Sequence, residues 1–132
     1  MDAATKDLVR RRAHKHCEYR RLHQRNSQLV HHVEHIVARK HGGPDDPDNL
    51  ALACHRCNLH KGRNLTGIDP ETGHVVPLFH PRRDPWPEHF VFKGARIEGR
   101  SSTGRATVQA LAMNDARSLE VRQEVLKYGD LI

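Results

Sequence analysis

The 132-residue sequence has no apolar run near the roughly 20 residues that a membrane span needs, and no apolar export segment near its start. It contains only 3 cysteines, and an odd number without an export signal favours reduced thiols or metal ligands over a disulfide framework. Mean hydropathy is −0.77, which predicts a modest core. These shortages exclude an integral membrane protein and a disulfide-rich secreted domain. We expect a cytoplasmic protein without a membrane partner.

Basic residues outnumber acidic ones, with 22 Lys and Arg against 16 Asp and Glu and a net charge of +6. This balance fits a polyanion partner such as nucleic acid, and it also fits a soluble basic protein with no such partner. The length suits one domain with a single core. Histidine is abundant, with 12 residues, and several lie beside cysteines and carboxylates.

One stretch, residues 30–62, carries most of the polar residues that could perform chemistry. Its apolar pattern predicts a strand over 29–37, a Gly- and Pro-rich loop over 38–48, a return strand over 49–53 and a helix over 55–61 that ends at Gly62. Glu34 and His35 lie near the end of the first strand, and Asn49 opens the second. Adjacent strand residues point to opposite faces, so Glu34 and His35 share a site only if the strand ends or twists there.

Phosphodiester hydrolysis needs an activated water and a Lewis acid on the phosphate. His35 is a suitable base, because neutral imidazole accepts a proton near physiological pH. Glu34 and Asn58 offer oxygen ligands to a hard cation, and Mg²⁺ needs only one or two protein ligands. His60 on the predicted helix and His32 on the strand are rival ligands.

The order Glu34-His35, Gly-Gly-Pro, Asn49 and Cys-x-x-Cys-Asn58 resembles the HNH endonuclease family, whose ββα-metal fold clasps one divalent ion between a β-hairpin and a helix. The resemblance implies that His35 is the general base, that Glu34 and Asn58 hold Mg²⁺ or Mn²⁺, and that Asn49 orients His35. It implies products with 5′-phosphate and 3′-hydroxyl ends. The chain is similar to an H-N-N variant, and most relatives have Asp where Glu34 stands. The segment LFHPRRDPW is similar to an extension found in some bacterial HNH proteins.

Related proteins also carry four cysteines that bind a structural zinc ion. Three are present here, Cys17, Cys54 and Cys57, and Arg20 stands at the fourth position. A cation cannot ligate Zn²⁺, which normally takes four ligands. Two interpretations stay open: a bound Zn²⁺ with a histidine (His14, His16, His23 or His55) as fourth ligand, or three cysteines packed as small buried residues.

The flanking segments predict further elements: an N-terminal helix over 5–17, a turn-rich connection over 63–73, a strand over 75–79, a hairpin over 90–97, and helices over 103–113 and from Asn114 or Asp115 to 128. Three prolines in residues 80–87 exclude a helix interior there. Six basic residues are candidates for phosphate contact: Arg39, Lys40, Lys61, Arg63, Arg82 and Arg83.

The sequence therefore predicts a small α+β fold. We expect one HNH domain over 1–132, with a ββα-metal core at 17–62 and an extension at 63–132 packed on it. The predicted function is metal-dependent cleavage of double-stranded DNA with low sequence specificity, by a monomer or a homodimer. The alternative is a non-catalytic nucleic-acid-binding module with a degenerate zinc-ribbon-like core.

Overall fold

The computed structural model describes residues 1–129, and within them the chain divides into two compact units. Unit 1 contains Met1–Arg63 and His80–Arg83, and unit 2 contains Asn64–Phe79 and the chain from Asp84 onward. The prediction that residues 63–132 pack on the core as part of one domain stays a prediction. No helix in residues 1–129 has the length and apolar character needed to cross a lipid bilayer.

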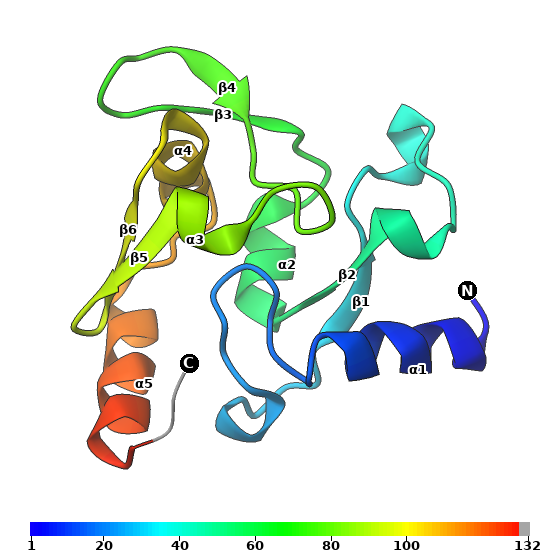
Figure 1. The fold of residues 1–132 in the computed structure, drawn as a ribbon, viewed down its shortest axis with the longest axis horizontal. Coiled ribbons are helices and arrows are strands. Elements are labelled where there is room, and N and C mark those ends of the chain that lie inside the picture. Colours follow the sequence, from blue (N-terminus) through cyan, green and yellow to red (C-terminus); the bar gives the residue numbers. More distant parts are fainter. Residues whose placement is uncertain (130–132) are drawn as a thin grey trace. The chain divides into compact units, whose positions relative to one another are not determined.

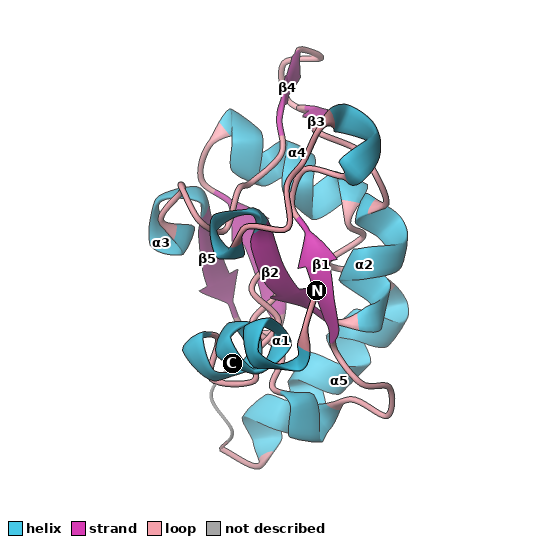
Figure 2. Ribbon diagram, turned by 90° about the vertical axis from the view of Figure 1, so that its right-hand side faces the viewer, coloured by secondary structure: helices cyan, strands magenta, loops and turns pink. Residues whose placement is uncertain are grey.

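The centre of unit 1 is a β-hairpin followed by a helix (Figure 1). Strands β1 (His32–His35) and β2 (Leu50–Ala53) pair antiparallel, with His35 opposite Leu50, and Figure 2 shows them side by side. Helix α2 (His55–Lys61) follows, as predicted, and ends at Gly62. The α+β prediction with a small ββα core is confirmed.

Strand β1 is shorter than the predicted 29–37, for two physical reasons. Leu29 and Val30 are 53% and 67% exposed, so no buried face anchors them in a sheet. At the other end, the side chain of Asn49 binds both backbone groups of Val37, which removes Val37 from the strand ladder. The strand consequently ends at His35, at the edge of the loop.

The N-terminal helix α1 (Ala3–Arg12) is also shorter than predicted. It ends because His14 and Lys15 adopt positive φ values of 50° and 59°, which no α-helix accommodates. Val9 packs with Leu50 and Leu52 in the buried core of unit 1.

Two arginines of α1 hold the hairpin rather than pointing freely into solvent. Arg10 donates to the carbonyl of His31 at 2.9 Å, and Arg12 donates to the carbonyls of Pro47 and Leu50 at 2.7 and 2.6 Å. The His31 carbonyl lies just before β1, the Leu50 carbonyl belongs to the first residue of β2, and the Pro47 carbonyl lies in the turn that leads into β2. Part of the basic character of this helix is therefore structural.

A tight turn over residues 16–23 is fastened to the free edge of β2. The N–H of Cys17 donates to the carbonyl of Leu22, which closes the turn. Glu18 then pairs with Leu52 twice: its N–H donates to the Leu52 carbonyl, and its carboxylate accepts from the Leu52 N–H, both at 2.8 Å. The same carboxylate forms an ion pair with Arg82. Arg82 is thus engaged within unit 1, and its predicted role in phosphate contact does not fit this structure.

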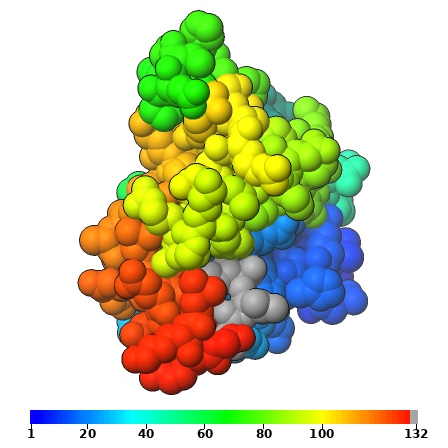
Figure 3. Space-filling view, turned by 60° about the vertical axis from the view of Figure 1, so that its left-hand side comes forward, coloured from blue at the N-terminus to red at the C-terminus, as the bar shows by residue number. Residues whose placement is uncertain are grey.

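Up to residue 129, unit 2 contains two hairpins and three helices. The hairpins are β3 (Thr66–Ile68) with β4 (Val75–Pro77), and β5 (Phe90–Lys93) with β6 (Arg96–Gly99). The helices are α3 (Trp86–His89), α4 (Ser102–Ala110) and α5 (Ala116–Lys127). The space-filling view shows the β3–β4 hairpin standing out from the rest of unit 2 (Figure 3).

Most of these elements agree with the sequence, and two were missed. The β5–β6 hairpin is confirmed, and α5 begins after the cap Asp115, as predicted. Strand β3 lies in a segment predicted to be only a connection, because the exposed Thr66 and Ile68 carry no apolar pattern. Helix α3 begins at Trp86 with a proline in its first turn, where a missing N–H costs nothing.

The interior of unit 2 combines an aromatic cluster with one buried ion pair. Trp86 lies with its ring centroid 5.1 Å from those of Phe90 and Phe92. Asp69 is fully buried and accepts two hydrogen bonds from Arg105, at 2.9 and 2.8 Å. These bonds hold the pKa of the Asp69 carboxyl well below its ordinary value. The pair ties the β3–β4 turn to helix α4.

Candidate functional site

The ββα core surrounds a depression of about 470 Å³ in unit 1. It is lined by residues from three separate segments: Glu34, His35, Ala38, Arg39, Lys40, Asn58, Gly62 and Arg63. Glu34 and His35 are the last two residues of β1, and Asn58 lies on α2. Because the strand ends at His35, these neighbours can both face the depression. The structure thus brings together the three side chains that the sequence assigned to base and metal ligands.

An aspartate that the sequence analysis did not single out is bonded to His35. Asp45 Oδ1 lies 2.7 Å from His35 Nε2. The hydrogen bond from His35, followed by those from Arg39, lowers the pKa of the Asp45 carboxyl. An ionised carboxylate only accepts hydrogen bonds, so in a neutral imidazole this contact places the proton on Nε2 and the lone pair on Nδ1. The sequence pattern did not single out Asp45, because it lies in a loop whose Gly, Pro and Asp residues predict only turns.

Asn49 hydrogen-bonds the backbone of the loop that follows His35. Its side-chain oxygen accepts from the N–H of Val37, and its amide donates to the carbonyls of Val37 and Pro44, all at 2.9 Å. Gly43 makes this contact possible, since a Cβ there would lie 1.7 Å from the Val37 carbonyl oxygen. Asn49 is 7% exposed and fixes the loop that leaves His35.

Lys61 was predicted to contact phosphate, but it is buried. It is 7% exposed, and its ammonium donates to the carbonyl of Ile36 at 2.8 Å, so it is not available to bind phosphate. Burial lowers the pKa of Lys61, and nearby Glu34 opposes that change. Burial likewise raises the pKa of Glu34, while His32, Lys61 and His35 lower it.

The remaining basic candidates differ in accessibility. Lys40 and Arg63 are exposed at the rim of the depression, and Arg39 is exposed there while pairing with Asp45 at 2.8 Å. Arg83 is exposed beside a second, smaller depression of about 230 Å³ in unit 1. Surface ion pairs such as Arg39–Asp45 are weak, so Arg39 can exchange its partner for a phosphate.

The two rival ligands, His60 and His32, do not line the depression. His60 is exposed on α2, and it is not among the residues that line the depression. His32 faces His55, with ring nitrogens 3.5 Å apart. Because neither residue lines the depression, Glu34 and Asn58 remain the candidate ligands.

The three cysteines form a separate buried cluster in unit 1. The sulfurs of Cys17, Cys54 and Cys57 all lie within 4.8 Å of one another, close enough to bind one metal ion such as zinc. Arg20, which is 3% exposed, donates from Nε to Cys57 Sγ at 3.0 Å. Hydrogen bonds from Cys17 and Cys57 lower the pKa of the Cys54 thiol, whereas burial raises the pKa of Cys17 to about 12.

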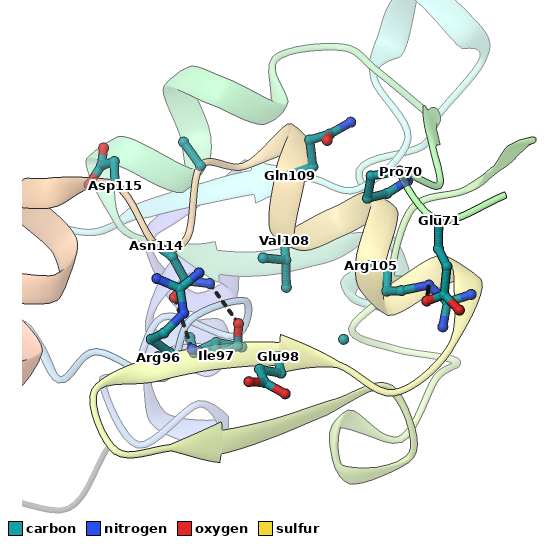
Figure 4. A pocket seen from close by; sticks show the side chains of 12 residues that line it. Pro70, Glu71, Arg96, Ile97, Glu98, Arg105, Val108, Gln109, Asn114 and Asp115 are labelled. Carbon is teal, nitrogen blue, oxygen red and sulfur yellow. Dashed lines mark hydrogen bonds and ion pairs between the residues drawn. The ribbon is translucent and has the colours of Figure 1, made fainter. Parts of the chain in front are cut away.

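Unit 2 has a larger hollow of about 700 Å³, which Figure 4 shows from close by. Its lining mixes both signs of charge, with Glu71, Glu98 and Asp115 near Arg96 and Arg105. Asn114 is used internally, because its amide binds both backbone groups of Ile97, as the dashed lines in Figure 4 show. Mixed charges give no field that attracts a polyanion, and we place the candidate site in unit 1.

Comparison with known proteins agrees with this choice. Residues 14–64 match the family model described as HNH endonuclease, and this range contains the cysteine cluster and the whole depression. Comparisons with curated proteins and with solved structures found no match. The match, the ββα core and the order of Glu34, His35, Asn49 and Asn58 agree with one another. Residues 14–64 of this chain are thus similar to the HNH endonuclease family.

Proposed function

We propose that this protein is a metal-dependent endonuclease that hydrolyses phosphodiester bonds of DNA in the depression of unit 1. HNH domains act on nucleic acids, and the net charge of +6 suits such a partner. The observation that supports hydrolysis most strongly is the His35–Asp45 hydrogen bond of 2.7 Å beside Glu34 and Asn58. A protein that only bound DNA would have no chemical use for a base oriented in this way.

His35 is the general base of the proposed reaction. Asp45 accepts from Nε2, which leaves Nδ1 to take a proton from a water molecule. The water oxygen forms a bond to phosphorus, and the bond from phosphorus to the 3′-oxygen breaks with its electron pair on that oxygen. The 3′-oxygen then takes a proton from solvent. The products carry a 5′-phosphate and a 3′-hydroxyl.

Glu34 and Asn58 would hold the catalytic Mg²⁺ or Mn²⁺. Both offer oxygen atoms at one depression, which is the donor type that these hard cations prefer. When bound, the metal acts as a Lewis acid on the phosphate. Asn49 keeps the loop after His35 in place through its bonds to Val37 and Pro44.

Arg39, Lys40 and Arg63 are the proposed phosphate contacts. They are exposed at the rim of the same depression. Such contacts position the DNA backbone without reading its sequence, and we therefore propose low sequence specificity on double-stranded DNA. Each of these side chains contributes to the salt dependence of binding.

The decisive experiment is nicking of supercoiled plasmid by the purified protein in Mg²⁺, in Mn²⁺ and in EDTA. The proposal expects nicked plasmid only with the metals. If the protein shifts DNA in a gel in a salt-sensitive manner and never cleaves it, the domain is the non-catalytic binding module instead. His60→Ala should nick like wild type, and loss of metal-dependent nicking in that variant would place the ligand at His60.

Replacing Asp45 with asparagine should slow nicking by about 10- to 100-fold. The amide can donate to Nε2, which favours the tautomer with its proton on Nδ1 and removes the free lone pair from the depression. The measurement is the single-turnover nicking rate at saturating Mg²⁺. Asp46→Asn, on the neighbouring residue, is the matched control and should nick at the wild-type rate.

Glu34→Gln should weaken Mn²⁺ binding by about 10-fold or more, because ligand charge sets the affinity for hard cations. Burial raises the pKa of Glu34, and the carboxylate form binds metal. Wild-type affinity should therefore fall as the pH drops from neutral to mildly acidic, and this fall should be smaller in the variant. Titration calorimetry with Mn²⁺ at both pH values measures it. Equal affinity in both proteins would remove Glu34 from the ligand set.

A further inference from the structure

The cysteine cluster of unit 1 contains a cation already. Arg20 is 3% exposed and lies on the same tight turn as Cys17, while Cys54 and Cys57 lie at the start of α2. Arg20 Nε donates a hydrogen bond to Cys57 Sγ at 3.0 Å. The guanidinium thus links the turn to the helix, which is the mechanical role that a structural metal performs in a zinc knuckle.

This arrangement fits a tetrahedral zinc ion poorly. Arginine has five donors and no acceptor, and it is not deprotonated in proteins, so Arg20 cannot become a ligand. A buried guanidinium needs negative or strongly accepting partners, and cysteine sulfur is one of them here. A zinc ion would compete for those same sulfurs and would add two positive charges next to a fixed one.

We propose that the guanidinium of Arg20 takes the place of a structural metal in this protein. The group formed by Cys17, Cys54, Cys57 and Arg20 holds the turn to α2 through sulfur–guanidinium hydrogen bonding, and unit 1 folds without zinc. A consequence is that unit 1 needs a metal ion for catalysis and needs none for folding. A chelator should then stop nicking without unfolding the chain.

The test is the zinc content of the full chain purified from cells supplied with zinc, measured by plasma mass spectrometry. Wild type should contain almost no zinc, and its thermal unfolding midpoint should be the same with and without EDTA. Arg20→Cys should carry about one zinc per chain and lose thermal stability in EDTA, because four thiolates complete the tetrahedron. Arg25→Cys is the matched control: it adds a thiol at an exposed position nearby and should stay free of zinc.

A second variant covers the case in which Arg20→Cys does not fold. Arg20→Ala removes the fixed cation, so added zinc should raise the unfolding midpoint of this variant more than that of wild type. About one zinc per wild-type chain, removed by chelator together with the folded structure, would overturn the proposal. So would equal stabilisation of wild type and Arg20→Ala by zinc. None of these readouts uses nicking, so the outcome is independent of the proposed nuclease activity.

Discussion

His35→Ala should reduce Mg²⁺-dependent nicking by about 10²- to 10⁴-fold, which is the usual contribution of a positioned general base. The variant loses the one histidine that lines the depression, and an imidazole can take a proton from water near neutral pH. The hydrogen bond of His35 is made to an exposed aspartate, Asp45, so losing this bond should change the free energy of unfolding little. The measurement is the initial rate of plasmid nicking at saturating Mg²⁺.

His41→Ala is the control for this variant. His41 is exposed, six residues after His35, and it does not line the depression. It should nick like wild type, and both variants should bind DNA with wild-type affinity in a gel-shift assay. An unchanged nicking rate in His35→Ala would mean that another group is the base or that a contaminating nuclease cuts the plasmid.

Asn49→Asp should lower the free energy of unfolding of unit 1 by roughly 2 to 4 kcal/mol. The aspartate keeps the acceptor for the Val37 N–H, but it loses the donor to the carbonyls of Val37 and Pro44. Both bonds are part-buried, so the loss of each donor costs about 1–2 kcal/mol, the lower part of the range for buried groups, and a charge now faces both carbonyls. Nicking should fall as well, because the loop after His35 is no longer held.

Urea unfolding followed by far-UV circular dichroism measures this change, since the single tryptophan, Trp86, lies in unit 2. The decrease in the free energy of unfolding should be smaller in acid, where the introduced aspartate takes up a proton and regains a hydrogen-bond donor. Asn58→Asp makes the same chemical change at a partly exposed position of the depression and should cost little stability. If Asn49→Asp were as stable as wild type, the loop would not depend on Asn49.

The sequence predicted those structural features that depend on residues close together in the chain. Residues 55–61 form α2 with the predicted bounds, because a glycine follows the last helical residue. Asp115 caps α5, as its residue type indicates. The close packing of Gly43 against Val37 explains the second glycine of the loop, and a φ of +84° explains the first, Gly42. These are short-range effects of backbone geometry and capping.

Contacts between distant residues could not be predicted in the same way. Lys61 looks like a surface cation in sequence, and only the fold shows its ammonium on the Ile36 carbonyl. Arg82 meets Glu18 across 64 positions, and Arg20 meets Cys57 across 37. The partner of His35, Asp45, is ten residues away in a loop whose composition says only that the chain turns. The role of a charged residue depends on the partner that the fold brings to it, and sequence patterns do not identify that partner.

Chemical rescue tests the role of His35 most directly. His35→Gly leaves an opening in a depression of about 470 Å³, where free imidazole can bind and act as the missing base. We predict that His35→Gly is nearly inert on supercoiled plasmid in Mg²⁺, and that added imidazole restores nicking in proportion to its concentration, with no nicking in EDTA. Nicking by His35→Gly at the wild-type rate without imidazole would contradict the account.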